Sequence, residues 1–273
     1  MVQLDARAAV FGAHGFVGRH LISYLSANGY AVRAIARGDQ SWRGEHLGHV
    51  FYTIGLTADF RSRPFETIDA HVGVLTDVLR GARFTSFVYC SSTRVYSSME
   101  TSLETARIPV APEDPDHLYN ISKLMGESAC LASGLAGARV ARLSNVFGED
   151  LASANFLTAV LREAVETGRV TLRTSLASEK DYVWVEDVVR ALEAIAVRGA
   201  EPITNVAFGR NTTHAEIMAA VTAATGADVH VAEGAPAVRV PPISTARLDN
   251  LIGRDRADVI LSIDKLAAAF RGR

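Results

Sequence analysis

The sequence predicts an α/β fold: a doubly wound parallel sheet with a small C-terminal substrate lobe. Three observations support this prediction. Short apolar runs alternate with helical patterns, a glycine-rich turn follows the first apolar run, and 273 residues with 48% hydrophobic content can bury a large core. Alternating strands and helices are typical of parallel sheets, because each parallel connection needs a crossover.

The expected elements follow one another along the chain. We predict strands at residues 8–11, 31–36, 50–54, 87–90, 138–143 and 203–207. We predict helices near residues 16–28, 65–81, 115–133, 153–167, 186–198, 213–225 and 263–270. From about residue 209 the pattern loosens, and three prolines interrupt it. We therefore expect a dinucleotide-binding domain of residues 1–145 plus 183–208 and a substrate-binding lobe of residues 146–182 plus 209–273.

The glycine-rich turn, Gly12-Ala-His-Gly-Phe-Val-Gly18, lies between the first strand and the first helix. One glycine permits the tight turn, another lets the backbone approach a pyrophosphate, and the third allows close helix–strand packing. The alternative is a glycine-rich turn that binds no ligand. The residues expected to contact a dinucleotide here are Gly12, His14, Gly15, Phe16, Val17 and Gly18, together with Gly55 after the third apolar run.

The second predicted strand ends in Ala36-Arg37, where an acidic residue usually binds the adenosine ribose. Without that acid nothing repels a 2′-phosphate, and the Arg37 guanidinium is suited to bind one. NADP is therefore favoured as the cofactor, with NAD as the alternative. In the other interpretation Arg37 is a solvated charge at the end of a strand.

The stretch from Arg37 to Val50 is too short for the usual helix, strand and helix. About 13 residues cannot supply two crossovers and a strand between them. We expect the third strand to be missing, residues 31–36 to form the sheet edge, and an irregular loop to lead to residues 50–54. Arg37 and residues 39–43 would then border the adenine, with Trp42 either against it or packed in the core.

A candidate catalytic set comes from Ser92 and the Tyr119-x-x-x-Lys123 pair. A phenol titrates near pKa 10, and a lysine one helical turn along the same face would lower that pKa. Asp114-Pro115 is a helix start, so the pair would lie in the first turns of a helix. Ser92 would hold the substrate oxygen. Taken without the other motifs, the spacing of Tyr119 and Lys123 could also belong to an ordinary amphipathic helix with no catalytic role.

The chain resembles the extended short-chain dehydrogenase/reductases, the NAD(P)-dependent epimerase/dehydratase group that acts mostly on nucleotide sugars. The motifs that carry the resemblance are Gly12–Gly18, Tyr89–Tyr96 with Ser92 at the catalytic hydroxyl position, Tyr119 with Lys123, Arg142–Gly148, Asp181–Asp187 and Asn205–Gly209. The resemblance implies a Rossmann-like fold, a nucleotide-sugar substrate, and cofactor contacts from Tyr119 and Lys123. It also implies that Asn145 contacts the substrate phosphates.

The departures from the family pattern reduce the number of reactions that we expect of this chain. Dehydratases place an Asp-Glu pair just after the catalytic hydroxyl, where this chain has Thr93 and Arg94, so dehydration is not expected. Lys180 replaces the usual arginine before the Asp-Tyr motif, and His71 replaces an asparagine. The expected substrate contacts are Thr93, Arg94, Asn145, Lys180 and Arg239.

Four functions follow from this reading. An NADPH-dependent keto-sugar reductase acting on a nucleotide-linked sugar is the leading one. The alternatives are an NAD-dependent nucleotide-sugar 4-epimerase, a reductase of a non-sugar carbonyl, and a catalytically idle NADP-binding regulatory protein. The intact Ser92, Tyr119 and Lys123 set argues against the idle protein.

Composition indicates which partners to expect. A net charge of −2 and short basic runs give no footprint for nucleic acid. No apolar stretch approaches the ~20 residues of a membrane span, and the N-terminus lacks signal-peptide features. Two cysteines favour a reducing, cytoplasmic setting.

Two histidines invite a metal-site interpretation. His46 and His49 lack further ligands at metal spacing, so we expect no metal. Apolar residues on several faces of the helix that carries Tyr119 predict a homodimer.

Overall fold

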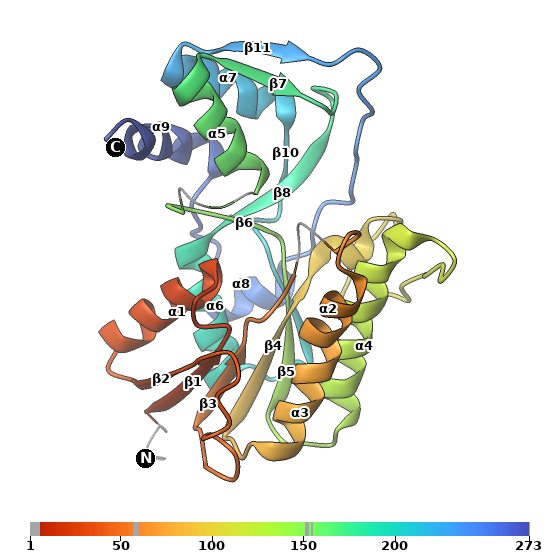
Figure 1. The fold of residues 1–273 in the computed structure, drawn as a ribbon, viewed down its shortest axis with the longest axis vertical. Coiled ribbons are helices and arrows are strands. Elements are labelled where there is room, and N and C mark those ends of the chain that lie inside the picture. Colours follow the sequence, from red (N-terminus) through yellow and green to blue (C-terminus); the bar gives the residue numbers. More distant parts are fainter. Residues whose placement is uncertain (1–5, 57–59, 151–152, 154, 273) are drawn as a thin grey trace.

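The computed structural model describes residues 6–56, 60–150, 153 and 155–272, and its centre is a parallel sheet of six strands (Figure 1). The strands follow the order β2-β1-β3-β4-β5-β9, and every neighbouring pair is parallel. Their bounds are β1 Arg7–Phe11, β2 Ala31–Ile35, β3 His49–Tyr52, β4 Ser86–Ser92, β5 Ala138–Leu143 and β9 Ile203–Val206. The predicted Rossmann-like α/β fold is confirmed.

Helices cover both faces of this sheet, because successive side chains of a strand point to opposite faces. Ala8 and Val10 pack with Leu21 of one helix layer, whereas Ala9 and Phe11 pack with Leu75 of the other. The first layer contains α1 Phe16–Ala27, α6 Val185–Arg198 and α8 Ala246–Ile252. The second contains α2 Pro64–Ile68, a π-helical turn Asp69–Gly73, α3 Val74–Gly81 and α4 Leu118–Ala132. The predicted helix 65–81 is thus three consecutive pieces.

The third strand of the usual pattern is missing from the described residues between β2 and β3, as predicted, and β2 forms the sheet edge. Trp42 holds the connecting loop. Its side chain is 2% exposed, its indole N–H donates to the Asp39 carbonyl at 2.7 Å, and its ring lies edge-on to Phe11 at 5.4 Å. Within this loop His46 forms one isolated parallel bridge with Arg83.

A second group of elements lies beyond the carboxyl ends of the strands (upper part of Figure 1). Its strands are β6 Asn145–Phe147, β7 Arg169–Leu172, β8 Glu179–Trp184, β10 Asn211–Thr213 and β11 Asp228–Val231. Its helices are α5 Phe156–Thr167, α7 His214–Thr225 and α9 Val259–Arg271, which pack on a core of their own. The three helices were predicted. The five strands were not, because they are three to six residues long and several are largely polar.

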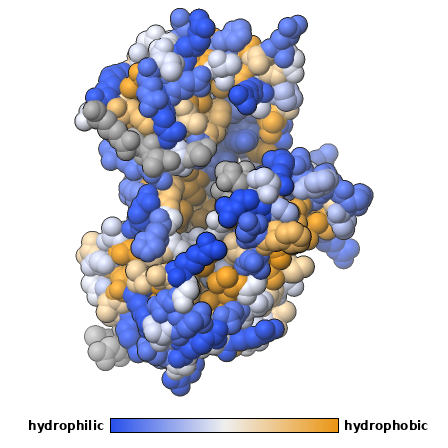
Figure 2. Space-filling model, in the orientation of Figure 1, coloured by the Kyte–Doolittle hydropathy of each residue, from blue (hydrophilic) through white to orange (hydrophobic). Residues whose placement is uncertain are grey.

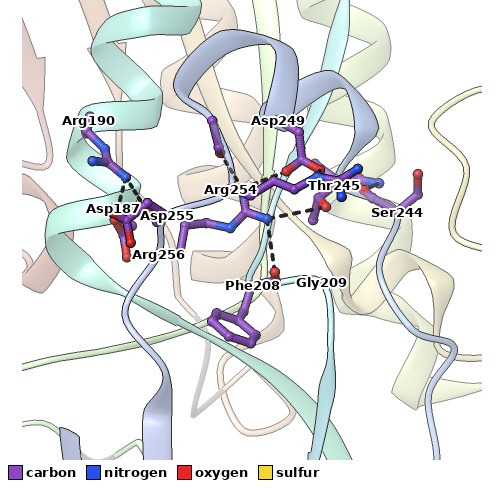
Figure 3. A network of polar contacts seen from close by, with 12 residues as sticks. Asp187, Arg190, Phe208, Gly209, Ser244, Thr245, Asp249, Arg254, Asp255 and Arg256 are labelled. Carbon is purple, nitrogen blue, oxygen red and sulfur yellow. Dashed lines mark hydrogen bonds and ion pairs between the residues drawn. The ribbon is translucent and has the colours of Figure 1, made fainter. Parts of the chain in front are cut away.

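A cluster of polar contacts joins this C-terminal part to the end of β9 (Figure 3). The Arg256 side chain is 4% exposed and donates to the Asp249 carboxylate at 2.8 Å and to the Phe208 carbonyl at 3.1 Å. The backbone N–H groups of Phe208 and Gly209 in turn donate to the Asp181 carboxylate at 3.0 and 2.6 Å. The turn after β9 is therefore fixed against β8.

Among the described residues, none of the helices is long and apolar enough to cross a membrane.

Candidate active site

The glycine turn is shaped by two contacts that exclude any side chain. Gly12 has a φ of 86°, and a Cβ there would lie 2.7 Å from the Thr53 hydroxyl oxygen. A Cβ at Gly18 would lie 2.2 Å from the Gly12 carbonyl oxygen. Only glycine therefore allows α1 to pack this closely on the turn.

The same turn leaves the N-terminus of α1 open to a ligand. A Cβ at Gly15 would meet only the Gly12 carbonyl, at 3.3 Å, so its outer side is unobstructed. Among the described residues no side chain caps α1, so its first N–H groups keep their capacity to donate. Open N–H groups at a helix N-terminus form an anion site, and these residues fit a dinucleotide pyrophosphate.

Two cavities meet at this turn and a third adjoins them at Ser92 and Asn145, and Figure 2 shows the surface hollowed between the six-stranded sheet and the second group of elements. The β2 cavity, ≈ 620 Å³, extends from the glycine turn along the end of β2. The central cavity, ≈ 440 Å³, lies over the ends of β1, β3, β4 and β5. The outer cavity, ≈ 590 Å³, lies between β4, β8 and residues 238–243.

Most of the predicted cofactor residues line two of these cavities. The β2 cavity is lined by Gly12, His14, Gly15, Arg37 and Gly55, and the central cavity by Gly15, Phe16, Val17 and Gly55. Gly18 lines neither cavity, because it packs under the turn. Thr53, at the end of β3, is a central-cavity residue that the sequence did not indicate.

The three predicted catalytic residues, Ser92, Tyr119 and Lys123, converge in the central cavity. Ser92 ends β4, and its hydroxyl oxygen accepts from the Arg94 N–H at 3.2 Å. Asp114 caps a short 3₁₀ turn through the Asp116 N–H at 2.9 Å, and this turn leads into α4. Tyr119 therefore lies in the first turn of α4, and Lys123 lies one turn further on the same face.

Burial sets the proton affinities of this pair. The Tyr119 side chain is 4% exposed, and burial raises its pKa, while the nearby Ser92 hydroxyl and the charge of Arg94 act to lower it. Burial lowers the pKa of Lys123 to about 8, while the thiol of Cys90 and the carboxylate of Glu127 act to raise it.

The cation acting on the Tyr119 phenol differs from the one expected. The Lys123 ammonium donates to the Cys90 carbonyl at 2.9 Å. The Arg94 guanidinium lies 5.2 Å from the centre of the Tyr119 ring, and its charge lowers the phenol's pKa. Lys123 remains within reach of a ligand, since it lines the central cavity. The sequence pattern placed Lys123 correctly, but it did not reveal the position of Arg94 over the ring.

His71 adds a further side chain to this site. It lies in the π-helical turn, fully buried, with its ring edge-on to Tyr119 at 5.3 Å. The Ser122 hydroxyl donates to the Tyr119 carbonyl, so it accepts from His71 Nδ1–H at 2.8 Å, and Nε2 accepts the Leu56 N–H at 3.3 Å. Burial, with the charge of Lys123, lowers the pKa of His71 to about 2. His71 is therefore neutral and joins α4 to the loop after β3.

At the β2 edge, Arg37 is exposed and lines the β2 cavity beside Ala36 and Gly38. The nearby Asp39 carboxylate is engaged, because it accepts from the Ser41 N–H at 2.8 Å and the Ser41 hydroxyl at 2.6 Å. Trp42 lines the same cavity but is packed in the core. It therefore supports the cavity wall and does not present its ring face to a ligand.

The outer cavity collects Thr93, Arg94, Asn145 and Lys180, four of the five expected substrate contacts. The Asn145 side-chain amide donates to the Asp181 carbonyl at 2.7 Å. Arg239 does not line this cavity. It is exposed, whereas its neighbours Val238 and Val240 form the wall, because successive residues of an extended segment point to opposite sides.

Other residues of the outer cavity had no sequence signal. Asn120 is 4% exposed and follows Tyr119, and its side-chain oxygen has no hydrogen-bond partner among the described residues. Arg61 and His117 also line the cavity. The two histidines considered for a metal bond elsewhere: His46 to Arg7 and His49 to Ser86.

Known proteins resemble this chain in sequence over most of its length. GDP-6-deoxy-D-mannose reductase of Pseudomonas aeruginosa is 28% identical over 245 residues, which cover 79% of each chain. The dTDP-glucose 4,6-dehydratase of Streptomyces griseus is 29% identical over 147 residues, which are 52% of this chain and 44% of the dehydratase. The chain therefore matches less than half of the dehydratase's length.

Solved structures share the fold. MoeE5 in complex with UDP-glucose and NAD has a TM-score of 0.81 at 21% identity, with 97% of this chain and 99% of that one covered. RMD from Pseudomonas aeruginosa complexed with NADPH has a TM-score of 0.81 at 22% identity, with 98% and 99% covered.

The model of the NAD dependent epimerase/dehydratase family matches residues 8–207, which include the glycine turn, Ser92, Tyr119 and Lys123. Nicotinamide dinucleotides are the cofactors of this family. The open N-terminus of α1 and the Gly12, Gly15 and Gly18 turn fit such a cofactor. The chain belongs to the NAD dependent epimerase/dehydratase family.

Proposed function

We propose that this protein is an NADPH-dependent reductase of a keto group on a nucleotide-linked sugar. The observation that carries the proposal is the convergence of Ser92, Tyr119 and Lys123 on the central cavity, which shares Ser92 with the outer cavity. The glycine turn would hold the cofactor on one side of these residues, and the outer cavity would hold the sugar on the other. The 28% identity with a GDP-6-deoxy-D-mannose reductase over 79% of the chain supports the same reaction class.

Each catalytic residue has a distinct role in this proposal. NADPH, when bound, supplies the hydride. The Tyr119 phenol donates the proton that the carbonyl oxygen gains, and the Ser92 hydroxyl holds that oxygen in place. Arg94 stabilises the phenolate that Tyr119 becomes. Lys123 orients the nicotinamide ribose from its position against the Cys90 carbonyl. The neutral His71 holds α4 and the loop after β3 together through its hydrogen bonds to both.

Residues 93 and 94 argue against dehydration. Removal of water from a sugar needs an acid and a base beside the reacting carbons. The two positions after Ser92 hold Thr93 and Arg94, and neither is a carboxylic acid. The proposal therefore stays with carbonyl reduction.

The proposed preference for NADP rests on Arg37. In the wall of the β2 cavity, Asp39 is bonded to Ser41, and Glu66 lies 3.4 Å from Arg63. Arg37 is thus the cation placed to meet a 2′-phosphate at the end of β2. A hydrogen bond to a charged group is worth about 1.5–3 kcal/mol, or about 10- to 150-fold in affinity.

Isothermal titration of NADPH and NADH tests this preference. We expect Arg37→Ala to weaken NADPH about 10- to 100-fold and to leave NADH nearly unchanged. Arg80→Ala is the control, because Arg80 is exposed on α3 and does not line the β2 cavity. Equal affinity of the wild type for both cofactors, or tightly held NAD, would favour the 4-epimerase instead.

The remaining parts of the proposal concern assembly and location. We propose a homodimer formed through α4 and the helices before it, where Phe65, Val74 and Met125 are 79%, 41% and 51% exposed.

We propose that residues 1–145 and 183–208 bind the cofactor and that residues 146–182 and 209–273 bind the substrate. A cytoplasmic location is also proposed, and both cysteines are free and buried.

A further inference from the structure

Two cations in the outer cavity have no acidic partner among the described residues. Arg94 and Lys180 are both half-buried, and no carboxylate of the described chain lies within ion-pair distance of either. Burial lowers the pKa of both, and the charge of Arg94 lowers that of Lys180 further. Two like charges facing one cavity without a counter-ion indicate that a ligand supplies the negative charge.

The acids around this cavity are engaged elsewhere. Asp116 pairs with Arg61, and Asp114 caps the turn before α4. Asp181 faces away and accepts the N–H groups of Phe208 and Gly209. The charge of Asp116 acts on Arg94 from beyond ion-pair distance, and none of these carboxylates pairs with Arg94 or Lys180 in the described structure.

The position of Arg94 says which part of a substrate it would meet. Its guanidinium lies 4.7 Å from the centre of the Phe60 ring and 5.2 Å from that of Tyr119. It lines both the central and the outer cavity, as Asn145 does, whereas Lys180 lines the outer cavity alone. A sugar reacting at Tyr119 therefore places its ring beside Arg94, and the linking diphosphate lies toward Lys180.

We propose that the sugar carries a carboxylate and that Arg94 binds it, so the substrate is a nucleotide-linked sugar acid. This inference rests on the proposed function, because it needs a sugar at Tyr119. A guanidinium lying over two rings presents a planar pair of donors that matches a carboxylate. A neutral sugar would leave Arg94 half-buried beside the reacting carbon with no carboxylate partner for its outer N–H groups.

Matched ligands that differ only in one carboxylate test this assignment. Isothermal titration of the NADP⁺-loaded enzyme would compare UDP-glucose with UDP-glucuronic acid, dTDP-glucose with dTDP-glucuronic acid, and GDP-mannose with GDP-mannuronic acid. We expect the acid of the accepted nucleotide to bind about 10- to 100-fold more tightly. In Arg94→Met this ratio should fall to near 1.

Arg239→Met is the matched control, because Arg239 adjoins the wall residues Val238 and Val240 but is exposed and does not line the outer cavity. It should keep the wild-type ratio. Equal binding of acid and neutral sugars by the wild type would overturn the inference and leave the proposed function standing. Equal weakening of both by Arg94→Met would show that Arg94 binds the diphosphate, which also overturns it. If no nucleotide sugar binds, the proposed function itself fails.

Discussion

Two arginines that share one carboxylate allow a sharp test of how the C-terminal part is held (Figure 3). Arg256 and Arg254 both donate to Asp249, at 2.8 and 3.0 Å, but their side chains are 4% and 86% exposed. Arg256 also donates to the Gly253 and Phe208 carbonyls, at 3.0 and 3.1 Å. We predict that Arg256→Met destabilises the protein far more than Arg254→Met.

The magnitude follows from burial. Removing one partner of a buried pair costs about 3–5 kcal/mol, and an exposed pair contributes about 0–1 kcal/mol. Asp249 is 14% exposed and keeps Arg254, so the lower figure, about 3 kcal/mol, is expected for Arg256→Met. At about 2–4 °C per kcal/mol for a chain of this size, the Tm should fall by about 6–12 °C.

Differential scanning calorimetry of the three proteins at pH 7 measures these shifts. Arg254→Met should melt within about 4 °C of the wild type. The reasoning is refuted if the two variants lose the same stability, or if Arg256→Met melts with the wild type. Either result would mean that the buried contacts of Arg256 with Phe208 and Gly253 contribute nothing net.

Three further predictions concern the active site and the assembly. Tyr119→Phe should lower turnover about 10²- to 10⁴-fold while NADPH binding, measured by titration, stays within a few-fold; turnover near that of the wild type would remove Tyr119 from the chemistry. Because burial lowers the pKa of Lys123 to about 8, its ammonium is present below that pH, so kcat should decline as the pH rises through about 8; a flat profile to pH 10 would contradict this. Light scattering should give a dimer for the wild type and a monomer for Met125→Glu, with Leu261→Glu, 84% exposed on α9, as the control that stays dimeric.

The sequence predicted the sheet well because its strands are buried on both faces. β1, β3, β4, β5 and β9 are mainly apolar runs that lie between helices, so their periodicity is clear. The absent third strand followed from counting residues between Arg37 and Val50, an argument from chain length alone. The strands of the second group were not predicted, because segments such as Asn211–Thr213 and Asp228–Val231 are short and partly exposed.

The candidate site was predictable where local spacing controls it. Tyr119 and Lys123 are one helical turn apart, and Ser92 ends a strand, so their convergence follows from the fold. Arg94 over the Tyr119 ring and His71 against Ser122 depend on contacts between distant segments, which no local pattern reports. Arg239 was expected in the substrate cavity but points outward, because a shift of one residue in an extended segment reverses a side chain's direction.

Transfer of labelled hydride is the most direct test of the central claim, that Ser92 and Tyr119 serve NADPH-dependent reduction of a keto-sugar. The wild type would be incubated with NADPH deuterated at the transferring position of C4 and with nucleotide-linked 4-keto sugars, and the products analysed by mass spectrometry. We expect one deuterium in the reduced sugar and stoichiometric NADP⁺, with both reduced at least about 100-fold in rate in Tyr119→Phe. Sugar products without deuterium, formed while NADPH is not consumed, would contradict the account.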